Sequence, residues 1–148
     1  MSDKKLPSRS ASERWCRRVG AWGLFVWLLG GVLLEALHGF KLAAYLEDPL
    51  RREMWTLAHA HGTLLSLTCL VLAWAGPLAA LAPRRARACD RLLAAGAVLL
   101  PLGFLLGGIV HSEADPGPGI LLVPVGGLLA AAGLALVAVA WRQPDPGR

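Results

Sequence analysis

The sequence predicts an all-α membrane protein, built as a bundle of four transmembrane helices with both termini on the cytoplasmic side. Of its 148 residues, 55% are hydrophobic and only 17% are charged, and the apolar residues gather in four long runs separated by short polar segments. These runs consist of Leu, Ala, Val and Gly without the period-two alternation of a membrane β-barrel. Helices therefore remain as the structure that satisfies the backbone polar groups inside lipid.

The four expected helices cover residues 21–40, 55–82, 91–111 and 120–141, and together they form one transmembrane domain over residues 19–142. Each has about the length that a bilayer requires. Residues 1–18 are polar and basic, which predicts a cytoplasmic tail without fixed structure, and residues 143–148 form a second cytoplasmic tail. The first apolar run also follows a basic stretch as in a signal peptide, but its length and the lack of a small-residue cleavage site favour a retained span.

The distribution of Lys and Arg predicts the orientation. Of the 15 basic residues, 12 fall on the side of the two termini, and Lys41, Arg51 and Arg52 fall on the opposite side. Because cytoplasmic segments near membrane spans carry the excess of Lys and Arg, we expect both termini in the cytoplasm and a bacterial-type inner (plasma) membrane as the location. This topology also explains the net charge of +5, so we expect no nucleic-acid partner.

Small residues and prolines within the apolar runs predict close helix packing. Gly103 and Gly107 form a GxxxG step, a spacing that lets membrane helices approach closely. Pro77, Pro101 and Pro124 lie inside the second, third and fourth expected helices, where each removes a backbone hydrogen bond. The glycine-rich faces fit a compact bundle, and they also fit packing in a homo-oligomer or against a larger membrane complex.

The three cysteines are Cys16, Cys69 and Cys89, and their spacing matches neither a disulfide framework nor a CxxC motif. With Cys16 and Cys89 on the cytoplasmic side and Cys69 inside a span, we expect reduced thiols. Acylation of Cys16, which lies beside basic residues, is the alternative.

The four histidines all fall near the outer ends of the expected helices, at His38, His59, His61 and His111. Glu35 precedes His38 by three residues, so both lie on one helix face, and an acid inside a span needs a partner or a ligand. Glu-x-x-His is a spacing by which helical bundles present a carboxylate and an imidazole to one metal ion.

His59 and His61 are two residues apart, which separates them by about 200° around a helix. They therefore cannot face the same bundle centre. His59 lies on the same helix face as Thr56, Thr63 and Ser66, so we place His59 in the polar interior. We expect His61 to face a neighbouring helix, a subunit or the headgroups.

The functional hypothesis is a transition-metal site formed by Glu35, His38, His59 and His111, a donor set that suits Cu, Fe or Zn. The variant is a b-type haem held axially by His59 or His61 together with His111, with nearby glycines leaving room for the macrocycle. Either ligand points to electron transfer, metal handling or sensing.

Other hypotheses remain open on the same residues. The histidines are structural if they bond to backbone or water and Glu35 pairs with Lys41 or a histidine, and the cluster is a proton or ion relay if it titrates near neutral pH. A third alternative is a non-catalytic membrane subunit or scaffold. The sequence contains no nucleophile-base pair, phosphate loop or hydrolase motif, so we do not expect an autonomous enzyme.

The segment His59-Ala60-His61-Gly62 resembles the His-x-His helices of some bacterial haem-copper-type membrane proteins and of small uncharacterised membrane families. The resemblance covers one helix and implies haem or copper binding at His59 or His61. The later stretch from Gly107-Gly108 to Gly126, which includes Asp115-Pro116-Gly117, resembles a family segment to which no activity is attached. The chain departs from the full oxidases, which have about a dozen helices and an adjacent His pair, so oxygen reduction and proton pumping are not implied.

Overall fold

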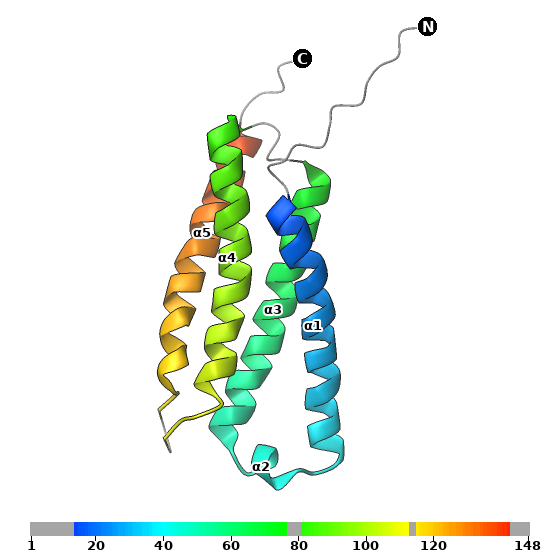
Figure 1. Ribbon diagram of the computed structural model, residues 1–148. Helices are drawn as coiled ribbons and strands as arrows, with labels where there is room; N and C mark the ends of the chain where they lie inside the picture. Colours follow the sequence, from blue (N-terminus) through cyan, green and yellow to red (C-terminus); the bar gives the residue numbers. More distant parts are fainter. Residues whose placement is uncertain (1–13, 77–80, 113–114, 143–148) are drawn as a thin grey trace, which may run out of the picture.

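The computed structural model describes residues 14–76, 81–112 and 115–142, which fold into four long helices (Figure 1). These are α1 (Arg14–Gly39), α3 (Pro49–Ala75), α4 (Pro83–Gly107) and α5 (Leu122–Trp141), with a short helix α2 (Ala43–Leu46) and a 3-10 turn η3 (Pro118–Leu121) in the connections. The described residues contain no strand. Four helical segments are long and apolar enough to cross a membrane, so the prediction of four such helices is confirmed.

The helix boundaries differ from the predicted ones, chiefly because three helices begin in polar sequence. Helix α1 begins at Arg14 instead of residue 21, so residues 14–18 of the predicted tail are helical. Helices α3 and α4 begin at Pro49 and Pro83, instead of residues 55 and 91, because proline suits the first helical turn. Hydropathy marks the part of a helix that lipid surrounds, whereas capping decides where the helix starts.

Helix α3 ends earlier than predicted, at Ala75 instead of residue 82. Gly76 follows in the left-handed conformation with φ 69°, which glycine adopts without steric cost and which commonly closes helices. Pro77 and the two tails, residues 1–13 and 143–148, lie outside the described residues. Likewise, α4 ends at Gly107, before the predicted residue 111.

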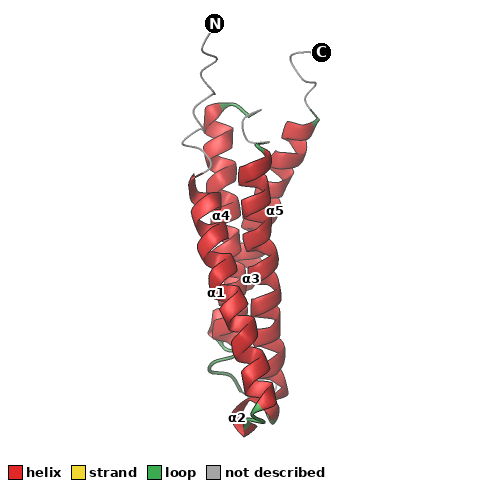
Figure 2. Cartoon of the chain, turned by 90° about the vertical axis from the view of Figure 1, so that its right-hand side faces the viewer, coloured by secondary structure: helices red, strands yellow, loops and turns green. Residues whose placement is uncertain are grey.

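Helix α4 is the centre of the bundle, since it packs against α1, α3 and α5 (Figures 1 and 2). Its apolar span is 44% buried, compared with 6% for α1. Helices α1 and α4 both begin at the end of the bundle where α5 finishes (Figure 1). We call this end the basic end and the opposite one, which carries α2, the α2 end.

The predicted close packing is formed within the chain itself. A Cβ at Gly96 of α4 would lie 2.7 Å from the backbone nitrogen of Ala130 in α5, closer than real side chains come. Gly133 fits in the same way against Leu93, and Gly20 of α1 fits against Leu70. The glycines therefore set the helix separations of the bundle, and these close-packed positions are not free for a partner.

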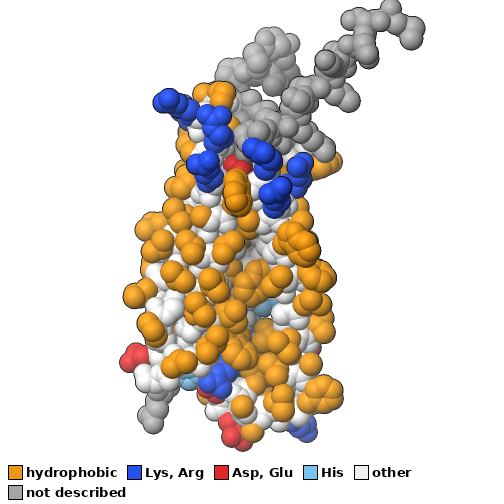
Figure 3. All heavy atoms as spheres, viewed as in Figure 1, with side chains coloured by type: hydrophobic (Ala, Val, Ile, Leu, Met, Phe, Trp, Pro, Cys, Tyr) orange, Lys and Arg blue, Asp and Glu red, His pale blue; other side chains and the backbone are white. Residues whose placement is uncertain are grey.

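The surface between the two ends is apolar. Large hydrophobic side chains are exposed along every long helix, including Trp22 and Val32 of α1, Trp74 of α3 and Leu128 of α5. Figure 3 shows them as a broad belt below Lys and Arg side chains gathered at the basic end. A soluble domain does not expose such an area, so the chain is a multi-pass membrane protein.

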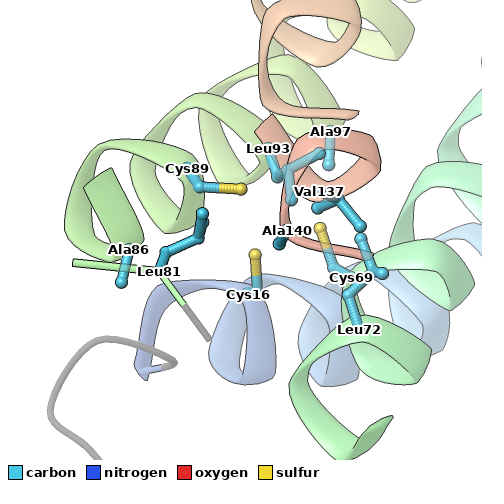
Figure 4. Packing of buried hydrophobic residues seen from close by; sticks show 10 residues of the cluster. All are labelled: Cys16, Cys69, Leu72, Leu81, Ala86, Cys89, Leu93, Ala97, Val137 and Ala140. Carbon is cyan, nitrogen blue, oxygen red and sulfur yellow. The ribbon is translucent and has the colours of Figure 1, made fainter. Parts of the chain in front are cut away.

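Near the basic end, the three cysteines meet in one buried cluster with aliphatic residues from all four long helices and the segment before α4 (Figure 4). Cys16, Cys69 and Cys89 are at most 1% exposed, and all three are free thiols, as predicted. Beside them lies Asp90, which is 2% exposed. Its carboxylate accepts hydrogen bonds from the backbone N–H of Trp15 at 3.2 Å and of Cys16 at 2.9 Å, so α4 caps the start of α1.

Candidate functional site

A pocket of about 670 Å³ opens near the α2 end between α1, α2 and α3. It brings together three of the predicted ligands, Glu35, His38 and His59. Tyr45 of α2 closes one side and contacts the His38 ring edge-on, with ring centroids 6.1 Å apart. The remaining walls combine charged and apolar residues: Gly31, Leu34, Pro49, Arg52, Glu53, Thr56 and Leu57.

The imidazole of His59 is held against α1 by a hydrogen bond and by shape. Its Nδ1 lies 2.7 Å from the backbone oxygen of Trp27, and because a carbonyl oxygen only accepts, Nδ1 carries the proton. The ring rests on Gly31, where a Cβ would lie 2.5 Å from the imidazole Cε1. In return, the Trp27 indole packs on Gly62 of α3. In the neutral imidazole, Nε2 then carries the lone pair and is the atom that can accept a hydrogen bond or bind a metal.

His61 lies on the other side of α3, as the spacing predicts. Its ring packs against Phe104 of α4 with centroids 5.1 Å apart, and its Nδ1 lies 2.9 Å from the backbone oxygen of Leu57. His61 therefore does not line the pocket that contains His59, and only one of the two imidazoles can serve a ligand bound there.

His111 also lies outside the pocket. Its Nε2 is 2.9 Å from the carboxylate of Asp48, and its Nδ1 is 3.0 Å from the backbone oxygen of Ser112. Both ring nitrogens of His111 are therefore engaged in hydrogen bonds at this position, and His111 is not among the residues that line the pocket. The structure thus separates His111 from the predicted set of Glu35, His38 and His59, and from the predicted haem pairing with His59 or His61.

No group of three or more His, Cys, Asp or Glu side chains within residues 14–76, 81–112 and 115–142 is arranged to hold a metal ion. Glu35, His38 and His59 share one pocket, but they do not converge on one point. A mononuclear centre built from protein ligands alone is therefore not preformed among these residues.

The Asp48 carboxylate connects the start of α3 with the segment that follows α4. It accepts a hydrogen bond from the backbone N–H of Arg51 at 2.9 Å, which caps α3, and it binds His111 across the bundle. The Arg51 side chain donates to the backbone oxygen of Gly108 at 3.1 Å and to that of Ala44 at 2.7 Å. The Arg51 backbone bond and the positive charges of His111 and Arg51 lower the pKa of Asp48 below its ordinary value.

Three pocket residues were not predicted from the sequence, Tyr45, Arg52 and Glu53, because the sequence pattern places them in a loop. Helix α3 begins at Pro49, so Arg52 and Glu53 occupy its first turns and face the same pocket as His59. The signal was Asp48-Pro49, a capping residue followed by a first-turn proline. The guanidinium of Arg52 is held by the backbone oxygen of Leu46 at 3.1 Å.

Comparison of the chain with family models, curated proteins and solved structures found no match.

Proposed function

We propose that this protein is an inner-membrane haem protein, with both termini in the cytoplasm, that binds a b-type haem in the pocket near the α2 end through the Nε2 atom of His59. The observation that carries the proposal is the 2.7 Å contact between His59 Nδ1 and the Trp27 carbonyl. Metal-bound histidines generally donate the proton of their second ring nitrogen to a carbonyl or carboxylate. His59 has this tautomer already, and its ring lines the pocket.

The arrangement favours haem over a bare metal ion. An ion needs three or four protein ligands at one point, and the described residues provide no such group. Haem brings four nitrogen ligands of its own and asks the protein for only one or two axial donors. A bare Cu, Fe or Zn ion, the other ligand that the donor types suit, would require Glu35, His38 and His59 to move toward one another.

The remaining pocket residues match parts of a haem. His38 lines the same pocket and is the candidate for the second axial position. Arg52 supplies a positive charge for a propionate, and Leu34, Leu57 and Gly31 offer an apolar wall for the ring. If His59 and His38 both held the iron, the haem would have no open site for oxygen, and the chemistry it would supply is one-electron transfer at the outer face of the membrane.

The test is the visible spectrum of protein purified in detergent from cells supplied with a haem precursor, together with elemental analysis. We expect a Soret band, α and β bands on reduction, and about one iron per chain. The variant His59→Gln keeps a side-chain donor for the Trp27 carbonyl but removes the imidazole, and it should lose the haem while keeping its helix content.

His61→Gln is the matched control, because it changes the same residue type two positions away and on another face of α3. It should retain the spectrum. Loss of haem from both variants, or retention in both, would contradict His59 as the ligand. Clean, folded wild-type protein with iron below a tenth of the chain concentration would refute haem binding, whereas stoichiometric Cu or Zn without a Soret band would assign the pocket to an ion.

A further inference from the structure

We propose that the chain also has a binding site for an anionic glycerophospholipid, formed by the groove between α1 and α4 and by the arginines between this groove and the basic end, separate from the pocket near the α2 end. The groove has a volume of about 270 Å³ and is lined by aliphatic and aromatic side chains. Trp22 and Val26 come from α1, and Ala97, Val98 and Leu102 come from α4. Trp22 and Val98 are 70% and 45% exposed, so the groove opens toward the lipid.

Three arginines continue the two walls of this groove toward the basic end. Helices α1 and α4 both start at that end, and the bonds from Asp90 to the backbone of Trp15 and Cys16 place these residues at one level. Arg91 directly follows Asp90, and Arg18 lies two residues after Cys16, so the two arginines stand at similar levels along the bundle, between the groove and the basic end.

The helical register aligns the arginines with the groove. On α4, Arg87, Arg91, Val98 and Leu102 are spaced at i, i+4, i+11 and i+15, which is one helix face. On α1, Arg18 lies one turn before Trp22. Arg18, Arg87 and Arg91 are all exposed. Because helical side chains lean toward the N-terminus, all three extend away from the groove toward the headgroup region.

Arg18, Arg87 and Arg91 lack an acidic partner within the described chain. Asp90 is the one acid at the level of these arginines in the described part of α1 and α4, and its oxygens accept from two backbone N–H groups. No carboxylate of the described residues lies within ion-pair distance of Arg18, Arg87 or Arg91. Figure 3 shows Lys and Arg side chains over the starts of α1 and α4, directly above apolar surface.

A cluster of cations above an apolar groove fits one class of ligand, a lipid with a phosphate headgroup and an acyl chain. The acyl chain would lie between Trp22 and Val98, and the phosphate would accept hydrogen bonds from Arg18 and Arg91. Basic pockets between membrane helices on the cytoplasmic side recognise anionic headgroups in this way. A zwitterionic lipid would place its own ammonium or choline group beside the arginines, so we expect discrimination by headgroup charge.

The experiment uses the full chain in detergent and measures binding of phosphatidylglycerol and of phosphatidylcholine with identical acyl chains by native mass spectrometry. We expect phosphatidylglycerol to bind roughly tenfold more tightly, since each arginine near the headgroup favours an anion. The triple variant R18Q/R87Q/R91Q should bind the two lipids equally. The triple variant R17Q/R85Q/R142Q removes the same charge from the same end of the bundle and should keep the preference.

Val98→Trp fills the groove and leaves the arginines intact, so it should weaken binding of both lipids to the groove between α1 and α4. Equal binding of the two lipids by the wild type would overturn the proposal. Equal loss of preference in both triple variants would also overturn it, because the effect would then be general surface charge. Helix content and haem content, measured in parallel, distinguish a failed site from a failed fold.

Discussion

The cap that Asp90 provides for α1 is the contact whose removal we expect to destabilise the bundle most clearly. Asp90 is 2% exposed and accepts from the backbone N–H groups of Trp15 and Cys16 at 3.2 and 2.9 Å. The first N–H groups of a helix have no partner within that helix. A carboxylate from α4 therefore satisfies two of them and also meets the positive end of the α1 dipole.

The expected loss follows from these two bonds. Losing a helix N-cap costs about 0.5–2 kcal/mol, and each buried N–H left without an acceptor costs about 1–3 kcal/mol. Because the hydrogen bond from Trp15 is only partly buried, we expect Asp90→Ala to lower the free energy of unfolding by about 2–4 kcal/mol. Asp90→Asn keeps one acceptor oxygen and should lose about half as much, since bonds to a neutral acceptor are weaker.

The assay is equilibrium unfolding in mixed micelles with increasing denaturing detergent, followed by circular dichroism. Asp115→Ala is the control, because Asp115 is an exposed acid in the connection before α5 and should change the midpoint little. A loss below about 0.5 kcal/mol for Asp90→Ala, within the range of ordinary surface substitutions, would refute the reasoning and would show that the first turn of α1 finds other acceptors.

Three further predictions concern helix packing, the pocket near the α2 end and pH. Gly96→Ala should destabilise the bundle by about 1–3 kcal/mol in the same assay, because its Cβ would meet the backbone of α5 at 2.7 Å, whereas Gly39→Ala, with nothing within 4 Å, should be neutral. Gly31→Ala should displace the imidazole of the proposed axial ligand from α1 and reduce the Soret absorbance severalfold, whereas Gly30→Ala in the same helix should retain it. The pKa of Asp48 is lowered in the folded state, so the Asp48 carboxylate stabilises the fold above its unfolded pKa of 3.8. This stabilisation is lost as the pH falls through the folded pKa. Asp48→Asn should therefore reduce the fall of the unfolding midpoint at acid pH, which a series of unfolding curves at different pH values measures.

Each of these predictions has a contradicting result. Equal destabilisation by the two packing variants would mean that the separation of α4 and α5 is not set at Gly96. Equal spectra for the Gly31 and Gly30 variants would remove the support that α1 gives to the proposed ligand. If the unfolding midpoint of Asp48→Asn fell at acid pH as much as that of the wild type, other carboxylates would govern stability below pH 4.

The sequence determined those features that depend on local composition and period. Four apolar runs predicted four long helices because a segment inside lipid has to satisfy its own backbone. The spacing of His59 and His61 predicted that they face different neighbours, which their contacts with Trp27 and Phe104 confirm. The absence of paired cysteine spacing predicted free thiols. None of these inferences required knowledge of which helices touch.

The tertiary structure decided which side chains meet. Glu35, His38 and His59 reach one pocket because α1 and α3 pack through their glycines, whereas His111 follows α4 to the Asp48 carboxylate. The role of Asp90 as a cap likewise depends on the contact between α1 and α4. Membrane helices are apolar on every side, so hydrophobicity does not select the faces that pack, and close fit between small residues does. For that reason the histidines were found from the sequence, but their partners were not.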